Sequence, residues 1–407
     1  MINQKINYMA ISGQYTSAKI FAENIEEAAL QWLQAQCNHP AFESVKIVQM
    51  PDVHAGNSCN VGTAYRIGAY VNPDHVGMDI GCTISMHRLS SLVAPEDYAL
   101  FDHKIRDTVP TGMNICEKNS LNEKELFRFL NSRYQKARSI APDLINEVVR
   151  IDARFVSDFC RRVKLQEGIF YKSLGTLGGG NHFIEYGEDE KTHEGWLTIH
   201  CGSRNLGVKV ANHWHNIARN PKRAQFIGYL WGDPLNGYLS DMVVAQAYAL
   251  YNHQIIHDKI FAILKKLCKA KCVESIFTTH NYIDVCEEYP MLRKGAVKAE
   301  EGELFCLPFN MRDGIAICIG KGNAEWNYSA PHGAGRAMSR NAAKKNIAME
   351  EFEKSMNGIF STSVCPGTLD ESPQAYKPME EILRLIEPTA EVITMVKTRL
   401  NIKDIPQ

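Results

Sequence analysis

Apolar and polar positions follow several different patterns along the chain, and each pattern predicts its own kind of element. Residues 24–37 (NIEEAALQWLQAQC) place apolar side chains at helical spacing and predict an amphipathic helix. The apolar run VKIVQMPDV at 45–53 predicts a buried strand. Residues 58–90, rich in Gly, Val and Ile, predict short strands and tight turns. Residues 95–166 are charged and helical, and we expect a helical segment resembling an insertion there.

The second half of the chain mixes the same patterns. Residues 168–207 predict strands and glycine turns, 208–270 a second helical stretch, and 275–320 strands again. A helix is expected after His332, and the C-terminal region is expected to end on a helix and a short tail. Because strands and helices interleave without a regular βαβ rhythm, the pattern favours an α+β fold. We expect one large domain over residues 1–407, with mixed β-sheets around a metal cleft and flanking helices.

Composition adds the class of protein. Of 407 residues, 45% are hydrophobic and 22% are charged, as in globular proteins with a sizeable core. No apolar run approaches the ~18 residues of a membrane span, and the first residues lack the layout of a secretory signal. Twelve cysteines without small-scaffold spacing favour reduced thiols and a cytoplasmic location. Because the net charge is −1, a polyanionic partner would need a local basic patch.

Five potential metal ligands lie beside glycines or in predicted turns. Asp79, Cys82, His182, His200 and His280 offer a carboxylate, a thiol and three imidazoles. With Cys82 as a bridge, this set is enough for two divalent ions, which in two-metal sites lie roughly 3.5–4 Å apart and clamp a phosphoryl transfer. The alternative is structural: the cysteine fills a core and each histidine makes an ordinary hydrogen bond. Spacing alone leaves both interpretations open.

Other histidines and cysteines also have spacings that suit a metal. Neither the HWH run at 213–215 nor the i, i+4 pair His253 and His257 has a nearby glutamate in an HExxH arrangement. The CKAKC run at 268–272 has no second Cys or His pair at zinc-finger distance. We expect surface or structural roles for these residues.

His332 is the candidate nucleophile. It lies in SAPHGAGR (329–336) before the predicted helix, and a helix N-terminus is a natural phosphate site. A histidine placed there can attack phosphorus. The following helix would carry a basic stripe, which either pairs with RNA phosphates or is a solvated face. The stripe consists of Arg336, Arg340, Lys344 and Lys345.

Further anion-binding candidates are Arg204, in GSRNLG, and Lys298, in RKGAVKAEEGE. The glycine run GTLGGGNHF lacks the GK[ST] ending of a P-loop, and the helix expected after a dinucleotide-binding turn is missing. An ATPase or a dinucleotide-dependent enzyme is therefore disfavoured.

Eight segments, all in order, make the chain similar to the RtcB-type RNA ligases, and the match runs nearly end to end. Each segment alone is a weak signal, whereas the ordered set is highly specific. The segments are MPDVHAG (50–56), HVGMDIGC (75–82), LGTLGGGNHFIE (174–185), HCGSRNLG (200–207), HNY (280–282), RKGAV (293–297), HGAGRAMSR (332–340) and AYK (375–377). The chain resembles a divergent member of this family.

The resemblance implies a pair of Mn²⁺ ions bridged by Cys82. One ion would take His182 and His200, and the other would take Asp79 and His280.

The resemblance also implies that His332 carries GMP and that Asp52 lies close enough to orient its ring. The implied GTP-binding residues, in addition to His332, are Asn181, Glu185, Gly333, Ala334, Gly335, Tyr376 and Lys403.

The implied reaction has three steps. GTP gives a histidine–GMP adduct and pyrophosphate, GMP passes to an RNA 3′-phosphate, and a 5′-hydroxyl then seals the bond and expels GMP. A 2′,3′-cyclic phosphate end is first opened to the 3′-phosphate. RNA and GTP are thus the expected partners, with an archease-like activating protein as a further one. The alternatives are a metal-dependent cyclic phosphodiesterase and an RNA-binding protein without ligation.

The sequence departs from the family pattern near the nucleotide. Residues 308–312 (PFNMR) replace the usual PGSMG turn, and Pro331 stands where serine is usual. Residues 55–57 (AGN) replace a glycine-lysine pattern, and His253 stands where arginine is usual. None of these changes removes a predicted ligand or the nucleophile. They affect the nucleotide contacts and the kind of RNA accepted.

Overall fold

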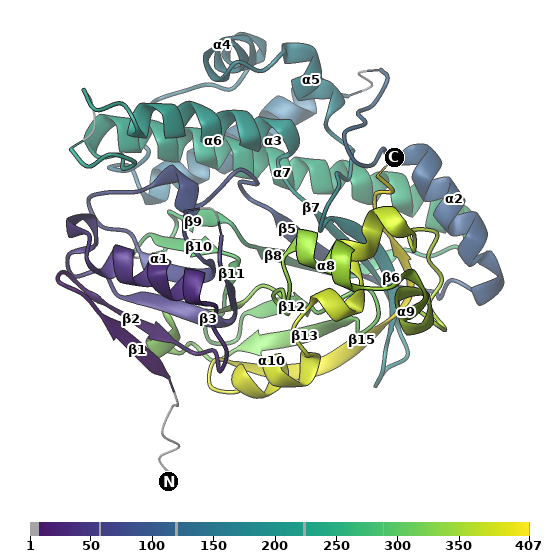
Figure 1. Ribbon diagram of the computed structural model, residues 1–407. Helices are drawn as coiled ribbons and strands as arrows, with labels where there is room; N and C mark the ends of the chain where they lie inside the picture. The colour runs from purple at the N-terminus through teal and green to yellow at the C-terminus, as the bar shows by residue number, and fades with distance from the viewer. Residues whose placement is uncertain (1–7, 57, 119–120, 223–224, 288, 407) are drawn as a thin grey trace.

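The strands form three β-sheets in the computed structural model, which describes residues 8–56, 58–118, 121–222, 225–287 and 289–406 (Figure 1). A six-stranded sheet has the order β1-β2-β3-β4-β10-β9, and only its β2–β3 pair is parallel. Helix α1 (Glu27–Cys37) makes the crossover between these two parallel strands, as its amphipathic pattern predicts. The strands are β1 (Met9–Ser12), β2 (Ser17–Ile20), β3 (Ile47–His54), β4 (Val61–Arg66), β9 (Tyr282–Asp284) and β10 (Met291–Lys294).

A seven-stranded antiparallel sheet carries most of the predicted ligands. Its order is β12-β13-β15-β6-β7-β5-β8. The two edge strands approach each other, because the Cys306 amide on β12 donates to Thr278 Oγ1 on β8 at 2.9 Å. The sheet is therefore curled, with an inside and an outside. The strands are β5 (Thr83–Leu89), β6 (Phe183–Asp189), β7 (Gly195–Cys201), β8 (Cys272–Thr279), β12 (Leu304–Pro308), β13 (Ile315–Gly320) and β15 (Ala390–Ile402).

Strand alternation gives this sheet two apolar faces. Ile84, Met86 and Ile317 belong to one cluster on the inside. Leu197 and Ile199 belong to a second cluster, together with residues of α7 (Gly232–Leu267) and α2 (Tyr98–Thr108), which cover the outside. The third sheet is the short antiparallel pair β11 (Ala296–Lys298) and β14 (Ser329–Pro331).

The predicted helical segment 95–166 contains the helices α2, α3 and α4, joined by stretches without helix. Its helices α3 and α4 share the largest apolar core with α6 and α7, through residues such as Leu130 and Phe159, whereas α2 belongs to the second cluster. In Figure 1, α3, α6 and α7 lie together above the sheets in this view, and α8, α9 and α10 lie below them. The remaining helices are α3 (Glu123–Ile140), α4 (Ala153–Val163), α5 (Glu167–Lys172), α6 (Arg204–Ala218), α8 (Arg340–Asn346), α9 (Met349–Ser355) and α10 (Met379–Leu385).

Three predicted elements are wrong in detail. The C-terminal region ends on strand β15, not on a helix, because Val392, Thr394 and Val396 continue a strong two-residue period of β-branched side chains. The second helical stretch begins earlier than predicted, at the start of α6.

The helix expected directly after His332 begins only at Arg340, where the Ser339 hydroxyl caps it by accepting from the Ala342 amide. Gly335, with φ +72°, lies in the segment between them. The predicted α+β fold with mixed sheets is confirmed. Among the described helices, none combines the length and apolar character that crossing a membrane requires.

Candidate active site

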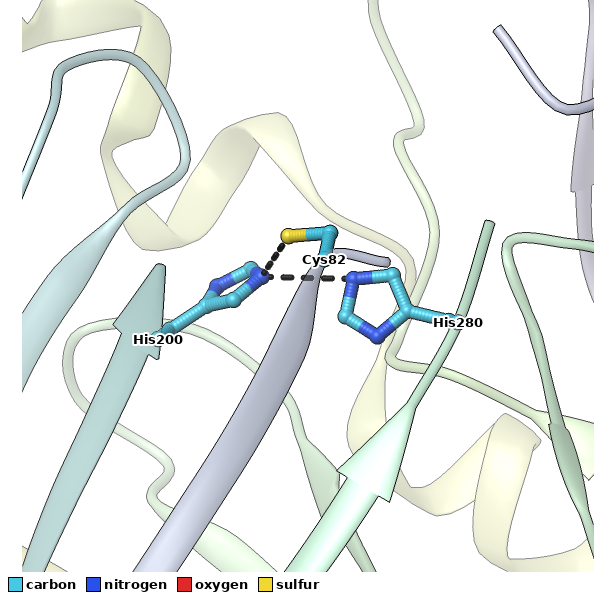
Figure 2. A group of neighbouring side chains, drawn as sticks. All are labelled: Cys82, His200 and His280. Carbon is cyan, nitrogen blue, oxygen red and sulfur yellow. Dashed lines mark hydrogen bonds between the residues drawn. The ribbon is translucent and has the colours of Figure 1, made fainter. Parts of the chain in front are cut away.

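Neighbouring strands bring three of the predicted ligands to one end of the curled sheet. Cys82 directly precedes β5, His200 lies near the end of β7, and His280 follows β8. Ile84 of β5 pairs with His200 on one side and with Thr278 on the other. Since alternate residues share a face, all three side chains point to the inside of the sheet. Figure 2 shows them converging.

His182 and Asp79 join this group from turns. The Nδ1 of His182 donates to the Leu177 carbonyl oxygen at 2.9 Å, which orients the ring and leaves Nε2 for the metal side. That Nε2 lies 2.9 Å from Asp79 Oδ2. Asp79 packs against Gly202, where an added Cβ would lie 2.1 Å from Oδ1, so the approach requires glycine.

The donor atoms are close enough to share ions. Sγ of Cys82 lies 3.2 Å from His200 Nε2 and 3.5 Å from His182 Nε2. His200 Nε2 lies 3.3 Å from His280 Nε2. The distances define two groups that share Cys82, one with Asp79 and His182 and the other with His200 and His280. Relative to the implied pairing, His182 and His280 are exchanged, and which ion each binds stays a prediction.

The chemistry of these five residues fits divalent cations. Burial lowers the pKa of His200 and His280 well below the ordinary value, so both rings are neutral and offer lone pairs. Burial, and then Asp79, raises the pKa of the Cys82 thiol, so a thiolate needs positive charge beside it. Although burial opposes ionisation, His182 lowers the pKa of Asp79. A carboxylate, a thiol and three converging imidazoles form a set that suits Mn²⁺ or another borderline metal.

The candidate nucleophile lies beside this group. Asp52, fully buried on β3, accepts from His332 Nδ1 at 2.7 Å and from the His332 amide at 3.3 Å. The proton on Nδ1 leaves the Nε2 lone pair free. The His332 ring centroid lies 4.9 Å from that of His280. Gly335 allows this arrangement, because a Cβ there would lie 2.3 Å from the Asp52 carbonyl oxygen.

One cavity of about 240 Å³ joins the metal group to the predicted nucleotide residues. His200 and His280 form part of its wall beside the nucleophile. All the predicted GTP-binding residues line it, and they are Asn181, Glu185, His332, Gly333, Ala334, Gly335, Tyr376 and Lys403.

Glu185 is held in this wall by β15. The carboxylate accepts from Asn401 Nδ2 at 2.7 Å and from Thr398 Oγ1 at 3.1 Å. Burial raises the pKa of Glu185 to about 8, and the two hydrogen bonds only partly oppose this. A bound cation beside Glu185 would favour its ionised form.

Glu371 also lines the cavity, and the sequence did not single it out. It accepts from Tyr376 Oη at 2.7 Å and Arg340 Nη1 at 2.6 Å, and pairs with Lys403 Nζ at 3.1 Å. Although burial opposes ionisation, Lys403 and Arg340 lower its pKa to about 2. Glu371 thus holds two of the predicted GTP-binding residues, Tyr376 and Lys403, in place. The segment DESPQAYK gave a usable signal, an acid close to the AYK motif.

The predicted basic stripe is only partly a helix face, and two of its cations on α8 have an acidic partner. Arg336 precedes α8, where its Nη2 donates to the Asp370 carbonyl oxygen at 2.7 Å. Arg340 and Lys344 are on α8 but pair with the Asp370 carboxylate, at 2.7 and 3.4 Å. The helix therefore packs against an acidic 3-10 turn, which the local sequence around residues 332–345 could not reveal.

Arg204 and Lys298, the other anion candidates, also have partners. Arg204 donates to the Gly112 carbonyl oxygen at 2.7 Å, and Lys298 Nζ lies 3.7 Å from Glu287 Oε1. His215 pairs with Asp74, which agrees with the predicted structural role of the HWH run.

Of the departures from the family pattern, residues 308–311 line the cavity. Arg312 turns to Asp313, with 2.6 Å between Nε and Oδ1. Pro331 is accommodated in β14, where it pairs with Ala296. Position 57 lies outside the described residues.

The geometry defines a class: an α+β protein with a histidine–aspartate pair beside a candidate two-metal site. A sequence model of the tRNA-splicing ligase RtcB matches residues 35–404, so the chain belongs to the RtcB family. The RNA-splicing ligase RtcB of Escherichia coli (strain K12) is 27% identical over 431 residues, covering 98% of this chain and 100% of that protein. The tRNA-splicing ligases RtcB of Nanoarchaeum equitans and Aeropyrum pernix are each 26% identical, covering 91% and 83% of this chain and 90% and 83% of those proteins.

Proposed function

We propose that this protein is a GTP- and Mn²⁺-dependent RNA ligase. It joins an RNA 3′-phosphate or 2′,3′-cyclic phosphate end to a 5′-hydroxyl end, in RNA repair or tRNA splicing. The observation that carries the proposal is the position of His332, held by Asp52 at 2.7 Å and beside His280 in the cavity lined by the candidate GTP residues. Family membership supports RNA as the substrate class.

His332 is the group that would carry the guanylate. Because Nδ1–H donates to Asp52, Nε2 has the free lone pair that attacks the α-phosphorus of GTP, and pyrophosphate leaves. The buried Asp52 carboxylate stabilises the positive charge that the ring gains in this step. An oxygen of the RNA 3′-phosphate then takes the guanylate from Nε2. The 5′-hydroxyl oxygen finally attacks the activated RNA phosphorus, GMP leaves, and the hydroxyl proton goes to solvent.

Two Mn²⁺ ions would be held by Asp79, Cys82, His182, His200 and His280. When bound they supply charge that neutralises phosphate oxygens during transfer. Glu185 and Asn181 line the cavity close in sequence to the predicted ligand His182, and we assign them to the phosphate side of GTP. Tyr376 and Lys403, fixed by Glu371, are assigned to the guanine and ribose.

Two other functions use only part of this site. A metal-dependent cyclic phosphodiesterase needs the ligand group but not a histidine held by a buried carboxylate. An RNA-binding protein without ligation needs neither. The pairing of His332 with Asp52 therefore favours the ligase. A cytoplasmic location and an archease-like activator stay predictions.

A joining assay separates the three functions. Two RNAs, one with a 2′,3′-cyclic phosphate and one with a 5′-hydroxyl, are incubated with the protein, Mn²⁺ and GTP. We expect a joined product that disappears when GTP is omitted. Opening of the cyclic phosphate without joining in the presence of GTP would identify the phosphodiesterase, and binding without either reaction would identify the RNA-binding protein.

Replacing Asp52 by asparagine tests the orienting carboxylate. In Asp52→Asn we expect the rate of GMP adduct formation to fall by about 100-fold or more, because the ring loses its anionic partner. Quench-flow or manual time courses with labelled GTP measure the rate, and metal content should be unchanged. Asp158→Asn, at an exposed carboxylate on α4, is the control. A wild-type rate in Asp52→Asn would remove Asp52 from the mechanism.

A further inference from the structure

A second group of metal-ligating side chains lies outside the cavity, near the opposite end of β8 from His280. His87 on β5, His257 on α7 and Cys272 at the start of β8 each offer one ligand atom, and these atoms all lie within 4.8 Å of one another. His87 is buried, His257 is partly exposed and Cys272 is an exposed free cysteine. None of the three lines the cavity of the candidate active site.

A β-bulge brings Cys272 to the face that carries His87. In the β5–β8 ladder Arg88 pairs with Glu274, but the next residue, Leu89, pairs with Cys272, so the register shifts by one. Without this shift Leu89 would pair with Val273, and Cys272 would point to the opposite face. Bulges re-aim side chains in this way and often lie near functional sites.

Helix α7 runs along the same face. Its His253 contacts Ser85, with 2.9 Å between Nδ1 and Oγ, and the rings of His257 and His87 are 4.6 Å apart between centroids. From His253 to His257 the helix rises about 6 Å, and from Ser85 to His87 the strand rises about 7 Å. Because these two rises nearly match, the helix can contact the strand at both positions. The structural role that the sequence predicts for this histidine pair holds for His253, which is buried and hydrogen-bonded on both nitrogens. It does not account for His257.

A chain of hydrogen bonds orients the lone pair of His87. The Cys201 carbonyl oxygen can only accept, so His253 Nε2 donates to it, at 3.0 Å. His253 Nδ1 then accepts the Ser85 hydroxyl proton, and Ser85 Oγ accepts from His87 Nε2 at 3.0 Å. The lone pair of His87 is therefore on Nδ1, which lies 2.8 Å from Ser275 Oγ. Burial, which lowers the pKa of both rings, agrees with these neutral forms.

The side chains of His257 and Cys272 also have hydrogen-bond partners that suit metal ligands. Asp258 Oδ1 lies 2.9 Å from His257 Nδ1 and accepts its proton, which leaves the lone pair on Nε2. A carboxylate behind a ligating imidazole is the usual second contact of a metal-bound histidine. Cys272 Sγ lies 3.3 Å from Ser275 Oγ, the atom that faces His87 Nδ1.

We propose that His87, His257 and Cys272 bind a Zn²⁺ ion, with the Ser275 hydroxyl or a water as the fourth ligand. Two imidazoles and a thiolate are a common zinc ligand set, and this group, unlike the five residues around Cys82, includes no carboxylate oxygen for Mn²⁺. Ligand atoms around tetrahedral zinc lie roughly 3.3–3.8 Å apart, so the group has to close by only about 1 Å. On binding, the Cys272 thiol forms its Zn–S bond and releases its proton to solvent. The ion would tie the exposed start of β8 to β5 and α7.

Protection of the thiol from alkylation tests the site in the full-length protein. The protein is saturated with Mn²⁺, one equivalent of Zn²⁺ is added, and the alkylation rates of Cys272 and Cys286 by iodoacetamide are followed by peptide mass spectrometry. Zn²⁺ should slow the alkylation of Cys272 by about tenfold or more, since a metal-bound thiolate is a poor nucleophile. Cys286, also an exposed free cysteine, is the internal control and should not change. Mn²⁺ alone should protect neither.

Variants then assign the ligands. His257→Gln should abolish the protection, and Asp258→Asn should weaken zinc binding by about tenfold. His213→Gln changes another partly exposed helical histidine and should keep the protection. Equal alkylation of Cys272 with and without Zn²⁺ would overturn the proposal, and so would full protection in His257→Gln. The wild-type measurement does not depend on whether any variant folds.

Discussion

Replacing Cys82 by alanine is expected to abolish both GMP adduct formation and RNA joining. Cys82 is shared by both ligand groups, so its loss should weaken the binding of both ions. Losing a shared thiolate should lower metal affinity by at least about 100-fold and activity by about 1000-fold or more. Metal content after gel filtration, labelled-GTP adduct yield and RNA joining are measured on the same preparation.

Cys201→Ala is the matched control for this variant. Cys201 is also a fully buried free cysteine, 3.5 Å from Asn252 Nδ2, but it belongs to neither ligand group. Its replacement should cost stability through a small cavity and leave metal content near wild type. If Cys82→Ala keeps wild-type metal content and activity in Mn²⁺, Cys82 is a core residue and the shared-ligand assignment is wrong.

Replacing His332 by alanine is expected to separate guanylate transfer from sealing. His332→Ala should bind metal like the wild type, because His332 belongs to neither ligand group. It should form no GMP adduct, a loss of at least about 10⁴-fold, since no other side chain replaces the nucleophile. It should still seal an RNA that is supplied with a 3′-guanylyl end, because that step starts after the histidine has acted.

Comparing the 3′-phosphate RNA with the 3′-guanylyl RNA separates the two steps in His332→Ala. Joining of the 3′-phosphate RNA should be lost in His332→Ala, while joining of the 3′-guanylyl RNA persists at a rate within about tenfold of wild type. A folded, metal-loaded variant that fails on both substrates shows that His332 does more than carry GMP. If the variant still joins the 3′-phosphate RNA, His332 is not the residue that carries GMP.

The sequence predicted the α+β class, the metal-ligand segments and the His332 segment because each leaves a local signal. Glycines next to Asp79 and His200 indicate close backbone approach, and strands that pair antiparallel bring their ends to one edge of a sheet. Glycine also marks the loop after His332, which packs directly on Asp52. In each case the signal lies within a few residues of the feature.

The features that the sequence did not predict depend on contacts between distant segments. Glu371 is important only because Arg340 and Lys403 reach it from elsewhere in the chain. Asp370 likewise pairs with Arg340 and Lys344 of α8, although the spacing of these two residues suits a free exposed face. Cys272 joins His87 only through a register shift in a ladder between strands that are far apart in sequence. Periodicity within a segment contains no information about such pairings.

The covalent state of His332 tests the central claim most directly. The wild-type protein is incubated with α-labelled GTP and Mn²⁺ and separated on a denaturing gel, and the labelled peptide is identified by mass spectrometry. We expect a labelled band that requires Mn²⁺, is absent with γ-labelled GTP, and carries GMP on His332 through a bond that is labile to acid. Label on another residue, or no covalent label while the same preparation joins RNA, would contradict the assignment of His332 as the guanylate carrier.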